Sequence, residues 1–334
     1  MLILGIESSC DDTAAAVLED NVILSNVLTS QDCIHTKFGG VVPELASRQH
    51  LQSIHPVVEA ALEKAGTQLS DINLIAATRG PGLIGSLLVG YSYSKALSYV
   101  SKIPLVGVDH MAGHILSIFL SPIKPPFPYI ALIVSGGTSS IYLAKSYHEF
   151  KLLGRTRDDA AGEAFDKVAK LLQLPYPGGP HVANNAKDGD RKYIRFPRAW
   201  LEESSLDFSF SGVKTAVLNH VNQQHLKGIE LRLGDICASF QEAVVDVLVA
   251  KTIMAARQNN IDTVVVGGGV SANARLREHF DERCKAEGLS FHAPQPIYCT
   301  DNAAMIALAG FHSFNHLGPI SLDEDVYSRS PLGS

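Results

Sequence analysis

The sequence predicts an α/β protein built from two related halves with a ligand cleft between them. Its 334 residues suit two domains of roughly 150 residues each. Apolar strand patterns alternate with helical patterns along the chain. One order of elements occurs twice: a hairpin with a polar turn, then helices, then a buried strand with a glycine-rich turn. A duplicated fold that closes on a ligand explains this repetition.

The first half begins with "LILGIESSCDDTAAAVLED", residues 2–20. Two apolar strands flank a polar turn, which exposes backbone N–H groups and carboxylates together and suits a phosphate with a counter-ion. Residues 41–66 place apolar side chains at helical spacing, and Gly66 is a typical end for that helix. The remaining elements are a strand over 72–80, a glycine-rich turn entering a helix over 80–100, and a strand over 103–110.

The pattern restarts after the proline-rich segment "SPIKPPFP", residues 121–128. Residues 129–146 again predict a strand, a glycine turn and a strand, with "SGGTSS" in the place of "ESSCDDT". Helices are expected around 162–174 and 238–258, and a strand, turn and helix over 261–280. We therefore expect domains over 1–127 and 128–301, with a helix near 302–315 packing back on the first.

The bulk composition is that of an ordinary globular protein, 46% hydrophobic and 19% charged. No apolar run is long enough to span a bilayer, and no signal peptide is evident, so a cytoplasmic protein without a membrane partner is expected. Five cysteines form no CxxC pair, which indicates neither a disulfide framework nor a thiolate zinc site. The net charge of −6 argues against gripping nucleic acid with the whole surface.

Basic residues are concentrated in the middle of the chain, where residues 145–232 carry 14 Lys and Arg against 11 Asp and Glu. The stretch "RKYIRFPRAW" interleaves cations with rings: Arg191, Lys192, Arg195 and Arg198 with Tyr193, Phe196 and Trp200. It is either a solvated loop with anchoring aromatics or a local contact for a nucleic-acid backbone.

Glycine-rich turns follow two strands of the second half. "VSGGTSS" offers backbone N–H donors from residues 135–138 to an oxyanion, and "GGGVSANARL" opens a helix whose first turn favours an anion. Asn273 could hydrogen-bond a ribose or base. Glycine also occurs wherever a chain bends sharply. Neither turn matches the Walker A or Rossmann spacing, so mononucleotide binding of the actin and sugar-kinase kind fits better.

The stretch "GVDHMAGHIL" places His110 and His114 four residues apart, on one face of a helix. They are either a metal-ligand pair or histidines placed there by packing. A metal needs a third ligand, for which Asp301 in "CTDNAAMIALAG" is the candidate, although Asp is also a common helix N-cap there. HxxxH is also the zincin spacing, but that peptidase chemistry needs Glu where this chain has Met111.

Nine motifs together carry a resemblance to a known family over nearly the whole chain. They are "GIESSCDDTAAAV", "FGGVVPELASRQH", "GPGLIGSLLVG", "HMAGH", "VSGGTS", "DDAAGEAFDKVAKLLQLPYPGGP", "LDFSFSGVKTAV", "GGGVSANARLR" and "CTDNAAMIA". With them the chain resembles the bacterial TsaD family of tRNA threonylcarbamoyladenosine synthases, formerly called glycoprotein endopeptidases.

The resemblance implies an actin-like (ASKHA) fold of two RNase H-like domains. It implies transfer of the threonylcarbamoyl group from threonylcarbamoyl-AMP to N6 of adenosine at tRNA position 37, in tRNAs that read codons beginning with adenine. AMP is released. The implied partners are tRNA, a TsaB-like paralogue and a TsaE-like small ATPase.

The resemblance also implies the site residues. One metal ion, usually iron, would be held by His110, His114 and Asp301, although these ligands suit zinc or manganese equally. The adenylate would contact Val134, Ser135, Gly136, Gly137, Thr138, Asp166, Gly179 and Asn273. Because the anhydride is already activated, orientation and charge stabilisation matter more than a nucleophile. Asp11, in the first turn, is expected to help remove the proton of the attacking amine.

Two positions depart from the family pattern. Thr138 stands where the family usually has a histidine, and Ala183 where many members have an aspartate. The alternatives to acyl transfer are an actin-like kinase or ATPase, which the glycine turns alone would support, and a non-catalytic scaffold, in which the histidines would be expected to be lost.

Overall fold

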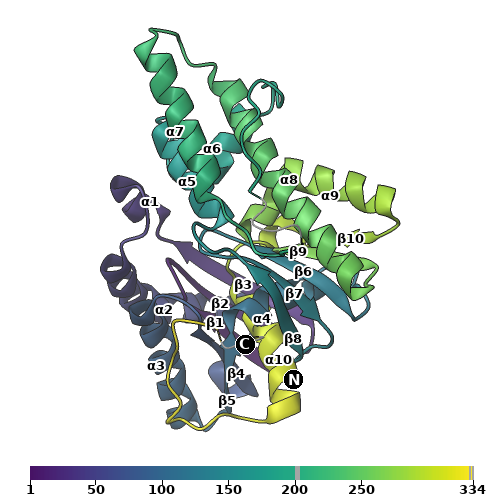
Figure 1. Cartoon of the computed structure of the whole chain (residues 1–334). Coiled ribbons are helices and arrows are strands. Elements are labelled where there is room, and N and C mark those ends of the chain that lie inside the picture. Colours follow the sequence, from purple (N-terminus) through teal and green to yellow (C-terminus); the bar gives the residue numbers. More distant parts are fainter. Residues whose placement is uncertain (200–203, 331, 333–334) are drawn as a thin grey trace. The chain divides into compact units, whose positions relative to one another are not determined.

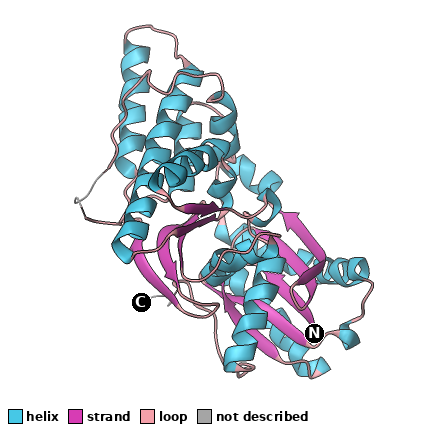
Figure 2. Cartoon of the chain, turned by 90° about the vertical axis from the view of Figure 1, so that its right-hand side faces the viewer, coloured by secondary structure: helices cyan, strands magenta, loops and turns pink. Residues whose placement is uncertain are grey.

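The structure is a computed structural model that describes residues 1–199, 204–330 and 332 (Figure 1). Its chain forms two compact units. Unit 1 comprises Met1–Lys124, Lys145–Phe150 and Pro294–Ser334, and unit 2 comprises Pro125–Ala144 and Lys151–Ala293. Each unit contains one five-stranded sheet, drawn in magenta in Figure 2.

Unit 1 carries the predicted hairpin, the parallel strands and the histidine helix. Its strands are β1 (Leu2–Glu7), β2 (Asp12–Glu19), β3 (Val22–Ser30), β4 (Leu74–Gly80) and β5 (Leu105–Asp109). Its helices are α1 (Asp32–His35), α2 (Pro43–Ala65), α3 (Ile84–Ser101), α4 (His110–Leu116) and α10 (Ala303–Leu317). As predicted, Gly66 ends α2, with a left-handed φ of 66°.

The sheet of unit 1 has the order β3-β2-β1-β4-β5. The hairpin β1–β2 and the pair β2–β3 are antiparallel, whereas β1–β4 and β4–β5 are parallel. Helix α2 packs on β2 and β3, and α10 packs on β1, β2, β4 and β5. Small residues allow α10 to lie close: a Cβ on Gly5 would be 2.3 Å from the carbonyl oxygen of Ala303.

Unit 2 repeats this topology with different residues. Its strands are β6 (Tyr129–Val134), β7 (Ser139–Ala144), β8 (Phe150–Arg155), β9 (Thr263–Gly267) and β10 (Ser290–His292). The sheet order is β10-β9-β6-β7-β8, with β6–β7 antiparallel and β6–β9 and β9–β10 parallel. In both sheets the first hairpin strand (β1 or β6) is central, with the next two strands of the chain on one side and the two parallel strands on the other. The predicted duplication of an α/β unit is confirmed.

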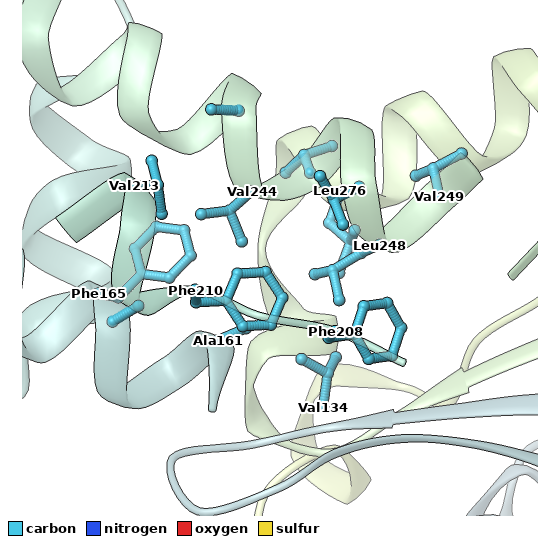
Figure 3. Close-up of a cluster of buried hydrophobic side chains, with 14 of the residues drawn as sticks. Val134, Ala161, Phe165, Phe208, Phe210, Val213, Val244, Leu248, Val249 and Leu276 are labelled. Atoms are coloured by element: carbon cyan, nitrogen blue, oxygen red, sulfur yellow. The ribbon is translucent and has the colours of Figure 1, made fainter. Parts of the chain in front are cut away.

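The helices of unit 2 enclose the larger core. They are α5 (Ala161–Leu171), α6 (Gly178–Asn185), α7 (Ser211–Leu226), α8 (Leu233–Asn259) and α9 (Ala274–Glu287). Helix α8 is apolar on most sides because α6, α7, α9 and the sheet all contact it. Phe165, Phe208 and Phe210 fill the space between α5, α8 and the end of β6 (Figure 3). This packing holds the glycine-rich turns of the sheet against α5.

The basic and aromatic stretch lies in unit 2 and is anchored to its helices. Phe196 is buried, Arg198 pairs with Asp246 on α8, and Arg232 lies over the ring of Tyr193. These contacts match the loop with anchoring aromatics, while nucleic-acid contact stays a prediction. Trp200, which belongs to the same stretch, lies outside the described residues. Across the described part of the chain, every helix is too short or too polar to cross a membrane.

Candidate metal centre and glycine turns

The two histidines lie on α4, which begins where β5 ends. Asp109 caps this helix, because its Oδ1 accepts hydrogen bonds from the backbone N–H groups of Met111 (2.8 Å) and Ala112 (3.4 Å). His110 and His114 are both buried, and their rings meet edge to face with centroids 4.6 Å apart. The helical spacing therefore brings both imidazoles to one place, as the sequence predicts.

Asp301 completes the cluster inside unit 1, 187 residues along the chain from His114. Its Oδ1 lies 3.0 Å from Nε2 of His114 and 3.4 Å from Nε2 of His110. One ligand atom from each residue lies within 4.8 Å of the other two, the spacing of a metal centre. The alternative that Asp301 caps α10 is wrong: Asn302 does so, through Oδ1 and the N–H of Met305.

Glu7, at the end of β1, is a fourth member of this site that the sequence did not reveal. Its side chain is fully buried, and Oε2 lies 2.9 Å from Nδ1 of His110 and 2.6 Å from Oγ1 of Thr78. Oε1 accepts the N–H of Ser9. A carboxylate at Nδ1 holds a proton on that nitrogen, so Nε2 is the ring nitrogen that faces Asp301 and would coordinate a metal ion.

Charge complementarity explains how four ionisable side chains share this interior. Burial opposes the charge of His110, but Glu7 and Asp301 outweigh it and raise the pKa of His110 well above its ordinary value. Burial likewise opposes both carboxylates, yet His110 lowers the pKa of each, and His114 also lowers that of Asp301. The two carboxylates therefore favour positive charge at the position between them.

The donor set fits a divalent cation. Two imidazoles and a carboxylate are ligands of iron, zinc and manganese, and an outer carboxylate on one imidazole is the usual support of such sites. Nδ1 of His114 is buried and has no hydrogen-bond partner among the described residues. At Nδ1, therefore, His110 has a carboxylate partner, whereas His114 has none among the described residues and is oriented by packing and by its contact with Asp301.

Two further carboxylates lie in the turn between β1 and β2 and at the start of β2: Asp11 and Asp12. Burial raises the pKa of Asp11 and raises that of Asp12 to about 7, with the charge of Asp301 adding to both shifts. A carboxylate whose pKa approaches neutrality suits proton transfer. Asp12, which the sequence analysis did not select, therefore suits proton transfer, and the pKa of Asp11 is shifted in the same direction. Burial also raises the pKa of the Cys10 thiol, which makes it a poor nucleophile.

The predicted oxyanion turn, residues 134–138, joins β6 to β7 in unit 2. Val134 ends β6 and is buried. Two of the four expected donors are used inside the turn: the N–H of Ser135 binds the carbonyl of Thr138 (2.8 Å), and the N–H of Thr138 binds Oγ of Ser135 (3.1 Å). The N–H donors that remain for an oxyanion are therefore those of Gly136 and Gly137. An added Cβ at either glycine would meet no atom within 4 Å.

The second glycine turn lies directly against the first. Gly268 has a φ of 84°, and a Cβ there would be 2.4 Å from the carbonyl oxygen of Val134. Asn273 caps α9 through Oδ1 and the N–H of Leu276 (3.0 Å), and its Nδ2 donates to Oε1 of Gln241 (2.7 Å). Both polar groups of Asn273 thus have partners within the protein, and its contact with a ligand stays a prediction.

Asp166 and Gly179 lie on the two helices that follow the turn. Oδ1 of Asp166 on α5 accepts the N–H of Gly178 at the start of α6 (2.7 Å). Gly179 adjoins open space, with no atom within 4 Å of an added Cβ. Helix α5 touches the glycine turn, because the N–H of Gly162 binds the carbonyl of Ser135 (3.1 Å). The structure therefore brings the predicted turn and the start of α5 together within unit 2.

Fold and site define a class of protein: a duplicated α/β protein of the actin-like type with a buried histidine–carboxylate centre suited to a divalent cation. Solved structures support the fold. HypF of T. kodakarensis aligns over 95% of this chain and 48% of its own, with a TM-score of 0.63 and 14% identity. Component A of the Acidaminococcus fermentans (R)-2-hydroxyglutaryl-CoA dehydratase aligns over 94% and 98%, with a TM-score of 0.55 and 17% identity. The predicted fold is confirmed.

Sequence comparison identifies the family. The family model "TsaD: tRNA N6-adenosine threonylcarbamoyltransferase" matches residues 22–308. A protein of that name from Desulfotalea psychrophila is 63% identical, with 100% of this chain and 98% of the relative aligned. Another, from Syntrophus aciditrophicus, is 55% identical over 99% and 98%. The chain belongs to the TsaD family, and the resemblance read from its motifs is confirmed.

Proposed function

We propose that this chain transfers a threonylcarbamoyl group from threonylcarbamoyl-AMP to N6 of adenosine 37 in tRNAs that read codons beginning with adenine. Membership of the TsaD family supports the reaction. The observation that carries the proposal is the convergence of His110 and His114 on Asp301, with Glu7 holding the far side of His110.

His110, His114 and Asp301 would hold one divalent metal ion, for which we propose iron. Bound there, the ion supplies Lewis-acid polarisation of the carbamoyl oxygen and a template for the two substrates. Glu7 keeps the Nδ1 proton of His110 and thereby presents Nε2 as a ligand. Both imidazoles are buried, so solvent has little access to them.

Because threonylcarbamoyl-AMP is already activated, acyl transfer needs correct orientation of the two substrates more than a nucleophilic side chain. The N6 amine of adenosine attacks the carbamoyl carbon, the bond from that carbon to the AMP phosphate oxygen breaks, and AMP leaves with the electron pair. Asp11 takes the proton that the amine releases, and its raised pKa suits this task. In unit 2, the N–H groups of Gly136 and Gly137 bind the AMP phosphate, and Asp166, Gly179 and Asn273 contact the nucleoside.

The proposed partners follow from the family resemblance: tRNA, a TsaB-like paralogue and a TsaE-like small ATPase, in the cytoplasm. A net charge of −6 supports this dependence, because tRNA binding by counterion release needs a larger basic surface. We therefore propose that the partners supply part of the tRNA contact.

The test is threonylcarbamoyl incorporation into tRNA with threonylcarbamoyl-AMP supplied and ATP left out. Incorporation by the wild-type protein with its partners supports acyl transfer, because a kinase would be inactive without ATP. Asp301→Ala and His110→Ala should each lower the rate at least a hundredfold and abolish stoichiometric metal in the anaerobically purified protein. His55→Ala, an exposed histidine of α2, is the matched control. Full activity in both site variants would refute the metal role.

A further inference from the structure

The described residues after α10 form neither helix nor strand, yet backbone hydrogen bonds attach this segment along the sheet of unit 1. The N–H of Ile320 binds the carbonyl of Leu105 at the start of β5 (2.9 Å). The N–H of Tyr327 binds the carbonyl of Arg79 near the end of β4 (3.1 Å). The segment therefore runs along the two parallel strands, β4 and β5, toward their carboxyl ends, where α4 begins. We call residues 324–330 the clasp.

Two side chains of the clasp contact Asp109, the residue that caps α4. Oδ2 of Asp109 accepts hydrogen bonds from the hydroxyl of Tyr327 (2.9 Å) and from Oγ of Ser330 (2.6 Å). Its other oxygen, Oδ1, accepts the N–H groups of Met111 and Ala112 in the first turn of α4. One carboxylate thus joins two clasp hydroxyls to the helix that carries both histidines.

Side chains from β4 and α3 hold the clasp in place. Nε of Arg79 donates to the carbonyl of Asp325 (2.6 Å), its guanidinium pairs with Glu324, and it lies 5.6 Å from the centre of the Tyr327 ring. Lys95 on α3 donates to the carbonyl of Glu324. These contacts involve both the backbone and the side chains of the clasp, so they specify one conformation for it.

Gly80 shows that the close approach of the clasp is part of the fold. A Cβ on Gly80 would lie 2.1 Å from the carbonyl oxygen of Tyr327 and 2.5 Å from its ring, and the φ of Gly80 is 155°. Any other residue at the end of β4 would displace the aromatic ring that reaches Asp109. The strand end and the clasp are therefore matched to each other.

We propose that Tyr327 and Ser330 are positioning residues that set the start of α4 and so hold His110 and His114 at the geometry a metal requires. Helix α4 has only 7 residues, too few to be stable by itself, so its position depends on tertiary contacts. All of its residues are buried and it packs against α10, while its first turn has a separate polar contact. Asp109 is the contact at its first turn, and the two hydroxyls fix the rotamer of Asp109. This inference rests on the proposed metal role of the two histidines.

The test measures zinc affinity and amide exchange on the full-length protein prepared without metal. In Tyr327→Phe with Ser330→Ala, we expect the Kd for Zn²⁺ to rise about tenfold, the scale of outer-shell effects on metal sites. Hydrogen exchange at the amides of Met111 and Ala112 should become faster, while exchange at the amides of the unit 1 sheet should not change. Ser330→Thr, which keeps the hydroxyl, should bind zinc like the wild type, as should Ser328→Ala at an exposed clasp position.

Three results would contradict the proposal or its basis, and the two measurements distinguish them. A Kd and an exchange pattern like those of the wild type in the double variant would refute the clasp. Faster exchange over all of unit 1, with a lower unfolding midpoint in urea, would show a general structural role instead. Failure of the wild-type protein to bind zinc would refute the proposed metal site, and exchange at the two α4 amides would still decide whether the clasp fixes the helix.

Discussion

Replacing Glu7 by glutamine tests whether the outer carboxylate controls the metal centre. Three donors converge on Glu7: Oε1 accepts the N–H of Ser9, and Oε2 accepts Thr78 and Nδ1 of His110. Glutamine has the same size but only one acceptor oxygen. If that oxygen faces His110, the amide NH₂ meets the N–H of Ser9. If it faces Ser9, His110 must accept at Nδ1 and carry its proton on Nε2, the atom that faces Asp301.

Both arrangements have a cost that can be estimated. Loss of an outer carboxylate lowers metal affinity about 10- to 100-fold, which corresponds to about 1.4–2.7 kcal/mol. A buried donor left without an acceptor destabilises the fold by about 1–3 kcal/mol. Because Glu7 is fully buried, water cannot replace the missing acceptor without rearrangement. Glu7→Gln should therefore weaken both metal binding and folding.

Two measurements on the same protein separate these effects. Competition with a chromophoric chelator gives the Kd for Zn²⁺, and urea titration of the metal-free protein gives the free energy of unfolding. Glu19→Gln, at the exposed end of β2, is the matched control and should change neither. A Glu7→Gln protein that binds zinc as tightly as the wild type would refute the role assigned to this carboxylate.

Two further predictions concern stability. Burial and neighbouring His148 lower the pKa of His312 to about 4, so between pH 6.5 and 4 the unfolded chain binds more protons and the wild type loses stability as pH falls. His312→Phe should show a smaller drop in urea midpoint between pH 7 and 5, and an equal drop would contradict this. Gly268→Ala, whose Cβ would strike the Val134 carbonyl at positive φ, should destabilise by about 2 kcal/mol or more. Gly179→Ala, beside open space, should stay within about 0.5 kcal/mol, and equal losses would show that the contact is unimportant.

The order of helices and strands was largely predictable, because it depends on residues that are close together in the sequence. Strands buried on both faces, such as β6, form continuous apolar runs, and the hairpin turns between strands carry glycine or polar residues. The outer strands β3 and β8 were not predicted. Each has only one buried residue and mixes apolar with polar residues, so neither length nor periodicity distinguishes them from loops.

The candidate site shows where local signals end. The spacing of His110 and His114 is a property of one helix and was visible in the sequence. The partner of His110 was not, because Glu7 lies 103 residues away and looks like the last residue of a strand. The only signal was a carboxylate that ends an otherwise apolar run. The partner of Asn273 was hidden for the same reason, because Gln241 lies on another helix, 32 residues earlier.

The sequence by itself determined the family, the duplicated topology and the residue types able to hold a metal, because these depend on motifs and on local periodicity. Only the tertiary structure decided which polar groups are already engaged. It assigned the N-cap of α10 to Asn302, it occupied two donors of the glycine turn, and it joined Glu7 to His110. The reason is physical: a buried polar group must find a partner, and that partner is set by the packing of distant segments.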